Sequence, residues 1–366
     1  MDNRVWEQAE IIVNHSTSIE AGDAVLLEVP PAAEDLGIAI AELVGERDAM
    51  LYAAYPNLLQ GNTRITSAYL NGADSESIQT PSHSQALYEE MDVGIMVRGE
   101  QNVTQLEDVP LPTQSAFRTA TEPLMAAYLE TRWCATQYPT TAYAQLAGMS
   151  THAYEDFVWD AINRDWDAQR AQQAKLVEIL EEASDIRIQC GETTDLRASL
   201  DGMGAVNDDG QKNLPGGEVF TTPVIDSVEG EILFDVPVYH QGEEIVDAYL
   251  RFEDGEVVSH TADSGEAVLD EILATDTGAK RVGELGFGMN RDIDRPTSNI
   301  LFDEKMGDTV HLALGFAYGM TVGEHRDQNE SAVHIDMVVD MSEDARIEVD
   351  GETIQQDGVY RFEDGY

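Results

Sequence analysis

The chain is poor in positive charge. Among its 366 residues, Lys and Arg number 21 and Asp and Glu number 70, which gives a formal net charge of -49 at pH 7. Only four of the basic residues are lysines, namely Lys175, Lys212, Lys280 and Lys305. A nucleic-acid partner is not expected, because the phosphates would be repelled. The acidic residues are spread along the whole chain rather than gathered in one block.

Such an excess of negative charge repels itself and destabilises a compact fold at low ionic strength. Concentrated salt removes much of this repulsion, because the screening length falls to about 3 Å at 1 M. We therefore expect a protein adapted to very high salt, as in the cytoplasm of a halophile. The alternative is an acidic buffer or cation-binding protein, although such proteins usually concentrate their acids in blocks.

Cysteine and long apolar runs are also scarce. Cys134 and Cys190 could form one bridge at most, which excludes a disulfide framework and is typical of ordinary packed thiols. No stretch approaches 18 uninterrupted apolar residues, and the start, MDNRVWEQAE, lacks the basic and apolar regions of a secretory signal. These absences predict a cytoplasmic protein with no membrane span and no membrane partner.

The N-terminal half alternates strand and helix patterns. A buried-type strand in residues 22–30 precedes an amphipathic helix in residues 32–49, and further strands are expected within 49–55 and 93–102. This alternation predicts βαβ units and a parallel sheet. The dipeptide Pro30-Pro31 stands where a G-x-G-x-x-G loop would lie, so a dinucleotide cofactor is not expected.

The pattern then becomes helical over residues 115–183, most clearly from 151 onward, with Ser150 or Thr151 as the N-cap. After residue 185, short alternating runs separated by Gly and Asp turns predict antiparallel sheet, interrupted by one helix. One core rarely grows to this length. We therefore predict two domains, an α/β domain over residues 1–185 and a β-rich (α+β) domain over residues 186–366.

Four stretches of the second half place a His or an acid in a Gly-rich or apolar context. The first, NLPGGEVFTTP, carries Glu218 directly after two glycines, and the second, VGELGFGMN, carries Glu284 beside Gly283. Taken alone, each glutamate could equally be a solvated residue of a turn or loop or part of a site. Glycine also permits close approach of the backbone to a ligand, however, which makes both glutamates candidates for a site.

The third and fourth stretches carry histidines within strand patterns. His311 shares a strand face with Ala313 and Gly315, whose small size leaves room beside the imidazole. His334 and Asp336 lie two residues apart, so their side chains leave the same face of a strand. Placing such groups in an apolar strand is costly unless they are paired or bind a metal. Alone, each stretch is also consistent with a hydrogen-bonded core histidine.

Together, two Glu, two His and one Asp form a set that is typical of a pair of divalent metal ions, because carboxylate and imidazole suit Zn²⁺, Co²⁺ or Mn²⁺. Two neighbouring ions need a bridging carboxylate and can activate a shared water. The motifs contain no thiolate, and H-E-x-x-H and G-x-S-x-G are both absent. Ser150, two residues before His152, is more simply a helix N-cap than a nucleophile.

The four motifs NLPGGEVFTTP, GELGFGMN, DEKMGDTVHLALG and NESAVHIDMV, in this order, resemble those of the thermophilic-type metalloaminopeptidases, the aminopeptidase T and aminopeptidase S group of peptidase family M29. The stretch RWCATQYPTTAYAQLAGMS also resembles the first-domain signature of this family, so the resemblance covers nearly the whole chain. It implies an N-terminal α/β domain, a β-rich C-terminal catalytic domain, and a homodimer that encloses the active sites. The acidic composition would make this chain a halophilic member.

By this resemblance, the metal ligands are Glu218, Glu284, His311, His334 and Asp336. One ion is expected to be held by Glu218, His311 and Asp336. The other is expected at Glu284 and His334, with one carboxylate shared. Each chain would thus bind two divalent metal ions (Zn, Co or Mn), and His334 and Asp336 would serve different ions.

The resemblance also implies three catalytic residues. Tyr318 matches a family tyrosine of the active site, Glu304 is expected as an extra ligand or the general base, and the ligand Glu284 could also carry the proton. The resulting hypothesis is a metal-dependent aminopeptidase that removes N-terminal residues from short peptides. The alternatives are a non-enzymatic acidic cation-binding α/β protein and a dinuclear metallohydrolase that acts on another amide.

Overall fold

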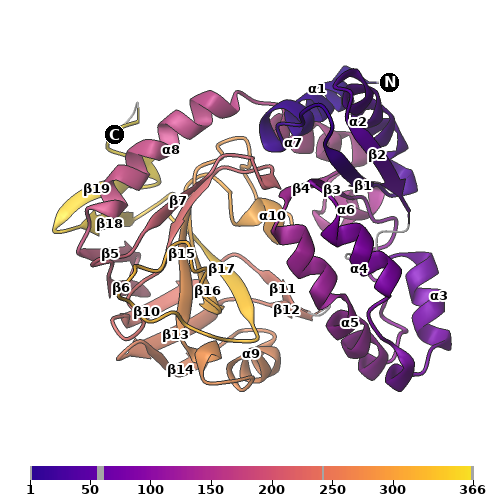
Figure 1. Cartoon of the computed structure of the whole chain (residues 1–366). Coiled ribbons are helices and arrows are strands. Elements are labelled where there is room, and N and C mark those ends of the chain that lie inside the picture. Colours follow the sequence, from indigo (N-terminus) through magenta and orange to yellow (C-terminus); the bar gives the residue numbers. More distant parts are fainter. Residues whose placement is uncertain (1, 56–61, 241–242, 364–366) are drawn as a thin grey trace. The chain divides into compact units, whose positions relative to one another are not determined.

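A computed structural model describes residues 2–55, 62–240 and 243–363. The chain forms two compact units (Figure 1), of which the first contains Met1–Arg164 and Gly210–Gly216 and the second contains Asp165–Asp209 and Gly217–Tyr366. This division differs from the boundary expected near residue 185. The change at residue 185 from a helical pattern to short alternating runs marks the start of strand β5 (Asp185–Cys190). This strand follows a helix of the same unit.

The first unit is built on a parallel sheet in the order β2-β1-β3-β4-β8, in which every pair of neighbours is parallel. The strands are β1 (Ala24–Glu28), β2 (Met50–Ala54), β3 (Val93–Arg98), β4 (Arg132–Gln137) and β8 (Asn213–Leu214). The two central strands β1 and β3 are almost wholly buried and rich in Val, Leu and Ile, as expected for parallel strands covered on both faces. The predicted α/β organisation is confirmed.

Helices connect these strands. They are α1 (Asn3–Ile11), which continues as a π-helical turn η1 (Ile12–Ser16), then η2 (Pro31–Ala33), α2 (Glu34–Glu46), α3 (Arg64–Gly72), η3 (Ser75–Ser77), α4 (Ser82–Glu89), α5 (Leu111–Leu129), α6 (Thr141–Leu146) and α7 (Thr151–Ile162). The Ser150 side chain caps α7, because its Oγ accepts a hydrogen bond of 3.3 Å from the amide of Ala153. The N-cap prediction is therefore confirmed at Ser150.

The expectation of a helical segment from 115 to 183 is wrong in one place. Strand β4 lies within it, as the sequence RWCATQ. This run is too short to show a period of two and lies between two helices, so periodicity alone does not separate it from them. The burial of its last four residues between β3 and β8 forms the strand.

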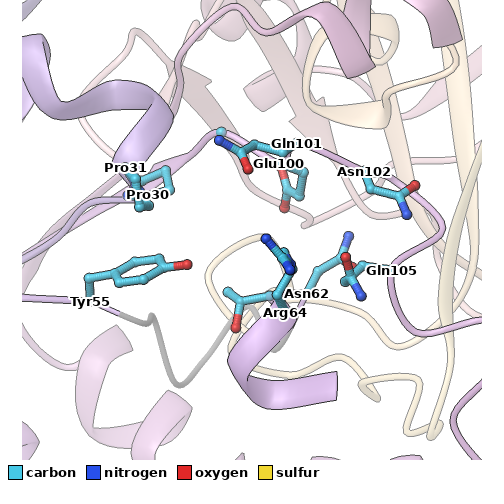
Figure 2. A pocket seen from close by; sticks show the side chains of 11 residues that line it. Pro30, Pro31, Tyr55, Asn62, Arg64, Glu100, Gln101, Asn102 and Gln105 are labelled. Atoms are coloured by element: carbon cyan, nitrogen blue, oxygen red, sulfur yellow. The ribbon is translucent and has the colours of Figure 1, made fainter. Parts of the chain in front are cut away.

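A small pocket of about 50 Å³ lies where β1 and β3 end (Figure 2). Its lining includes Pro30, Arg64 and Glu100. Within the described part of the chain, Oε2 of Glu100 is buried without a hydrogen-bond partner, and burial raises the pKa of this carboxyl. The carboxyl ends of parallel strands are a common ligand site, but none of the predicted metal ligands lines this pocket.

The second unit contains two sheets. The larger has the order β14-β13-β10-β6-β5-β18-β19-β20, the smaller has the order β17-β16-β15-β9-β7, and β11 pairs with β12. The remaining strands are β6 (Thr194–Ser199), β7 (Ala205–Asp208), β9 (Glu218–Thr221), β10 (Glu229–Phe234), β11 (Val238–His240), β12 (Glu243–Ile245), β13 (Ala248–Glu253), β14 (Glu256–Thr261), β15 (Val282–Gly288), β16 (Thr309–Gly315), β17 (His334–Asp340), β18 (Ala345–Val349), β19 (Glu352–Gln356) and β20 (Val359–Tyr360). All the strand pairs within the two sheets are antiparallel, as predicted.

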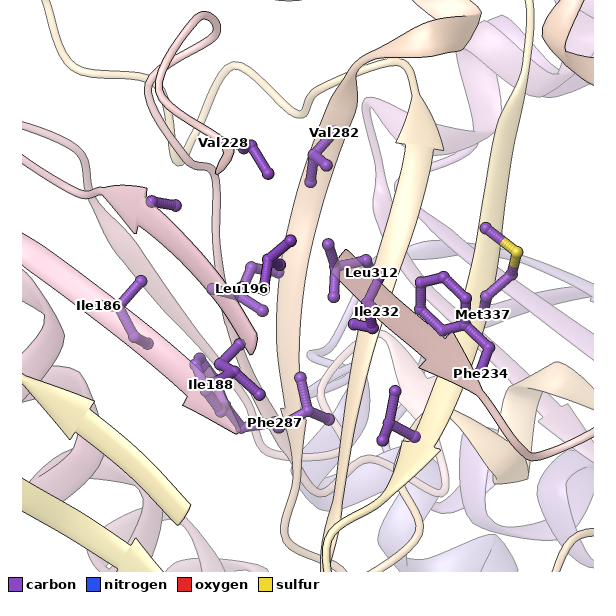
Figure 3. Close-up of a cluster of buried hydrophobic side chains, with 14 of the residues drawn as sticks. Ile186, Ile188, Leu196, Val228, Ile232, Phe234, Val282, Phe287, Leu312 and Met337 are labelled. Atoms are coloured by element: carbon purple, nitrogen blue, oxygen red, sulfur yellow. The ribbon is translucent and has the colours of Figure 1, made fainter. Parts of the chain in front are cut away.

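The two sheets pack against one another through a shared apolar core (Figure 3). Ile188 of β5 and Phe234 of β10 belong to it from the larger sheet, and Phe287, Leu312 and Met337 belong to it from the smaller one. Because side chains alternate along a strand, the smaller sheet turns its other face away from this core. That second face is the one that carries the predicted metal ligands.

Four helical elements complete the second unit, namely α8 (Trp166–Glu181), α9 (Glu266–Leu273), η4 (Gly278–Lys280) and α10 (Ile300–Asp303). Helix α8 lies against β7 and β9, where Gln173 donates hydrogen bonds to the carbonyls of Asp208 and Glu218. Of the helices within residues 2–55, 62–240 and 243–363, none has the length and apolar character needed to span a bilayer.

Truncation of Leu312 tests the importance of the shared core. Leu312 is 1% exposed, and we expect Leu312→Ala to lower the free energy of unfolding by about 2–5 kcal/mol, because it leaves a cavity between the sheets. The measurement is urea denaturation in molar KCl. Val258→Ala, at a residue of β14 that is 48% exposed, is the matched control and should cost less than about 1 kcal/mol. Equal losses for the two variants would contradict this assignment of the core.

Candidate metal centre

The register of the smaller sheet places the predicted ligands on one face. Ala313 of β16 lies opposite Glu284 of β15 on one side and opposite Asp336 of β17 on the other. Two residues along β16 and β17, Gly315 lies opposite His334. Directly opposed residues of antiparallel strands point to the same face. The Glu284 and Asp336 side chains thus flank a small alanine.

His311 reaches this face two residues earlier on β16, where it lies opposite Gly286 of β15. A Cβ atom added at Gly286 would lie 1.9 Å from Nε2 of His311, so the imidazole occupies the space that any larger residue would fill. Glu218 begins β9, the next strand across from β15. Gly286 is therefore required sterically for His311 to lie on the sheet surface.

Glu218, Glu284 and His311 form one group of buried side chains that could hold a metal ion. Oε2 of Glu218 and Oε1 of Glu284 each lie 3.3 Å from Nε2 of His311. Such separations fit neighbouring ligands of one ion, since metal–ligand bonds to N and O are about 2.0–2.2 Å long.

Glu284, His334 and Asp336 form a second such group. Nε2 of His334 lies 4.0 Å from Oε2 of Glu284 and 3.6 Å from Oδ1 of Asp336. The other ring nitrogen, Nδ1, lies 2.8 Å from the carbonyl oxygen of Phe316. Because a carbonyl can only accept, Nδ1 must donate, which leaves Nε2 directed at the carboxylates.

All five predicted ligands are thus brought together, and Glu284 belongs to both groups through its two different oxygens. The observed grouping differs in one respect from the expected division of these ligands between two ions. Asp336 was expected with Glu218 and His311, whereas the structure groups it with His334 and Glu284. The assignment of single residues to single ions stays a prediction.

The chemistry of the residues fits divalent metal ions. Among the described residues, buried atoms without a hydrogen-bond partner include Oε2 of Glu218, Oδ1 of Asp336 and Nδ1 of His311. Buried polar atoms are rarely left unsatisfied, and two of these three are oxygen acceptors that point into the ligand groups. Oxygen and imidazole donors of this kind favour Zn²⁺, Co²⁺ or Mn²⁺.

In the protein without metal, the histidines are stabilised in their charged form. Burial alone would lower the pKa of His311, but the hydrogen bond with Glu284 and the charges of Glu218 and Asp336 outweigh it and raise the pKa to about 9. Burial likewise opposes charge on His334, yet Asp336 and Glu284 raise its pKa to about 10. Metal ligands must be deprotonated, so an incoming ion would have to displace these protons.

The two further catalytic candidates also lie at this site. The Tyr318 ring centroid is 5.0 Å from that of His334, and Tyr318 is 40% exposed, so its ring is accessible from solvent. Glu304 follows helix α10 rather than lying in a simple turn, and it forms an ion pair with Lys305. Burial raises the pKa of Glu304 to about 7, although the charge of Lys305 opposes the increase.

The sequence analysis missed three residues that surround Glu218. They are Lys305, Asp208 and Gln173. Lys305 could have been found, because it is one of only four lysines and directly follows the candidate Glu304. Asp208 and Gln173 give no such signal, since an acidic residue in an acidic chain and a helical glutamine are both common.

Comparison with known proteins identifies the family of this chain. The family described as thermophilic metalloprotease (M29) matches residues 1–366. Aminopeptidase T of Thermus aquaticus is 28% identical over 389 residues, covering 94% of this chain and 93% of the relative. Aminopeptidase AmpS of Bacillus subtilis is 34% identical over 182 residues, which cover 44% of each chain.

Two solved structures share the fold. Wild-type AmpT from Thermus thermophilus has a TM-score of 0.85 at 24% sequence identity and covers 98% of this chain and 99% of its own. A 2,5-dihydroxypyridine dioxygenase from Pseudomonas putida has a TM-score of 0.62 at 14% identity, over 100% of this chain and 99% of its own. The same fold therefore occurs in proteins whose titles name different chemistries, and fold alone does not give the reaction.

The family match covers residues 1–366, which include the four motifs with the candidate ligands. It agrees with the resemblance seen in those motifs and with the gathering of their acids and histidines on one sheet face. The chain belongs to the thermophilic metalloprotease family M29, and it is a peptide-hydrolysing metalloenzyme.

Proposed function

We propose that this protein is a two-metal aminopeptidase that removes N-terminal residues from short peptides. The position of Glu284 is the observation that carries the proposal. Its Oε1 faces His311 and its Oε2 faces His334, so one carboxylate is shared by two ligand groups. A shared carboxylate is the arrangement that a pair of neighbouring ions requires.

Glu218 and His311 would hold one ion and His334 and Asp336 the other, with Glu284 between them. Bound divalent ions supply Lewis acidity, which polarises the scissile carbonyl and lowers the pKa of a nearby water. The relatives named aminopeptidase T and AmpS support an N-terminal amine as the feature recognised in the substrate. Recognition of the free amine beside the residues that would hold the ions would set the position of the scissile bond.

The residues around the ligands would orient the substrate and move protons. Tyr318, which is exposed and lies beside His334, would donate its phenolic proton in a hydrogen bond to the developing oxyanion. The carboxylate of Glu304 would accept the proton of the attacking water and return it to the leaving amine. Glu284 is the alternative proton carrier. A homodimer stays a prediction from the family resemblance.

We also propose that the protein works at high salt. The net charge of -49 is spread along the chain, and the buried Lys305 is one of very few lysines. Repulsion among exposed carboxylates falls as the screening length shortens, whereas buried pairs are screened much less. Salt should therefore stabilise the whole fold rather than weaken its interior ion pairs.

Loss of the metal or of the shared ligand should abolish hydrolysis. We expect chelator treatment in molar KCl to remove activity on Leu-p-nitroanilide, and added Zn²⁺, Co²⁺ or Mn²⁺ to restore it. Glu284→Ala should lower kcat/KM by about 1,000-fold, since metal stabilisation is worth several kcal/mol. Glu343→Ala, at an exposed turn residue, is the matched control and should leave kcat/KM unchanged. Full activity in the chelated protein would refute the proposal.

Gly286→Ala should displace His311 without removing any ligand. The added methyl would overlap the imidazole, so we expect Zn²⁺ affinity, measured by calorimetric titration of the metal-free protein, to fall by about 10–100-fold. The control is Gly45→Ala in helix α2, where a Cβ meets nothing within 4 Å and the affinity should stay the same. Unchanged affinity in Gly286→Ala would show that His311 is not a ligand.

The salt proposal predicts that the thermal midpoint of unfolding rises as KCl is increased from about 0.1 M to several molar, over which the screening length falls from about 10 Å to 3 Å or less. The measurement is circular dichroism at fixed protein concentration and fixed metal content. Sodium sulfate serves as a second salt that separates charge screening from salt exclusion. A midpoint that stays constant or falls with KCl would exclude adaptation to high salt.

A further inference from the structure

Lys305 is the least expected residue of the metal centre. Its side chain has 0% exposure, and Nζ lies 3.0 Å from Oε1 of Glu218 and 3.6 Å from Oδ2 of Asp208, with an ion pair to Glu304 as well. Burying a lysine is costly unless its charge is paired. A chain with only four lysines nevertheless places one of them here.

The contact with Lys305 distinguishes the two oxygens of Glu218. Oε1 accepts the hydrogen bond from Nζ, whereas Oε2 has no hydrogen-bond partner in the described chain and lies 3.3 Å from Nε2 of His311. When one oxygen of a carboxylate is held in a hydrogen bond, the other oxygen is the one directed at a metal ion. The orientation of Glu218 is thus fixed by a residue that is not itself a ligand.

Lys305 is itself held firmly. Its amide donates to the carbonyl of Phe302 at 3.0 Å, and its carbonyl accepts from the amide of Asn290 at 3.0 Å. The backbone of Glu218 is fixed as well, because its carbonyl accepts a 2.7 Å hydrogen bond from Gln173. With both backbones anchored, the ion pair determines the direction of the Glu218 side chain.

The distribution of charge around Lys305 also links this lysine to Glu218. Five carboxylates gather here, namely those of Asp208, Glu218, Glu284, Glu304 and Asp336. Among described residues, Lys305 is the only lysine or arginine within 4.0 Å of any of them. It contacts the three that lie on the Glu218 side and neither Glu284 nor Asp336. The cation is therefore specific to one ligand group.

We infer that Lys305 is a positioning residue of the metal centre, which holds Glu218 through Oε1 so that Oε2 alone is presented to the ion beside His311. This inference rests on the proposed metal site. It gives the lysine a role in ordering one of the two ligand groups, while the group of Glu284, His334 and Asp336 is formed without it. Outer partners that orient metal ligands typically affect affinity by about 10–100-fold.

The test is calorimetric titration of the metal-free protein with Zn²⁺ in molar KCl, accompanied by the visible absorption spectrum of the Co²⁺-loaded protein. In Lys305→Met, one of the two binding steps should be retained and the other should weaken by about 10–100-fold, because Glu218 is no longer oriented. The Co²⁺ spectrum should change, since Oε1 becomes available as a ligand. Lys175→Met, at an exposed lysine of α8, is the matched control and should leave both readouts unchanged.

Lys305→Met removes the cation from three carboxylates and can fail to fold for that reason alone. Lys305→Met combined with Asp208→Asn removes one charge of each sign and is compared with Asp208→Asn alone. Weakening of one binding step in the double variant relative to Asp208→Asn would support the positioning role. Two wild-type binding steps with a wild-type Co²⁺ spectrum, in either variant that lacks Lys305, would overturn it.

The controls separate this inference from the proposed function. If the wild-type protein binds no Zn²⁺, the proposed metal site fails and the positioning role fails with it. If the wild-type protein binds two equivalents and the variants that lack Lys305 do the same with equal affinity, only the positioning role fails. Neither readout depends on peptide hydrolysis.

Discussion

Repulsion among buried carboxylates is the constraint on which the second unit depends. Five acidic side chains gather in one region, four of them on strands of the smaller sheet and Glu304 at the end of helix α10, and such a cluster is unstable unless cations balance it. Without metal, the balance comes from Lys305 and from the two histidines, whose pKa values are raised by the surrounding carboxylates. With metal, two divalent ions would take the place of the histidine protons, and Lys305 would remain. The same excess of acid that would destabilise the cluster would favour the binding of cations.

The sheet geometry explains how such a cluster can exist beside an apolar core. Residues of β15, β16 and β17 alternate between the two faces, so Phe287, Leu312 and Met337 anchor the strands while their neighbours carry the polar groups. The positions between the ligands are kept small, at Gly286 and Ala313. The apolar face therefore supplies the rigidity that the polar face needs, and a ligand set drawn from four distant stretches of sequence is held in register by backbone pairing.

The fold class, and the five acids and histidines that the structure brings together, could be predicted from the sequence because both depend on local patterns. Period-two alternation with polar interruptions identified the strands around His311 and His334, and motif order identified the family. Strand β4 was not predicted, because its six residues lie inside an otherwise helical stretch and their burial, rather than a sequence pattern, forms the strand. The sequence-based prediction grouped Asp336 with Glu218 and His311, whereas the strand register brings Asp336 beside Glu284 across Ala313; which ion each residue would hold stays a prediction. Lys305 was not predicted although it directly follows Glu304, because its contacts with Glu218 and Asp208 join stretches that are distant in the sequence.

The path of the chain between β7 and β9 has a consequence for how the two units were acquired. After β7 the chain leaves the second unit, adds β8 to the parallel sheet of the first, and returns to begin β9 with the ligand Glu218. Neither unit is a continuous stretch of sequence. A single cut at any position would separate β8 from its sheet or divide one of the two units, so the two units cannot be exchanged by simple fusion. Recombination during evolution would have to carry them as one gene segment.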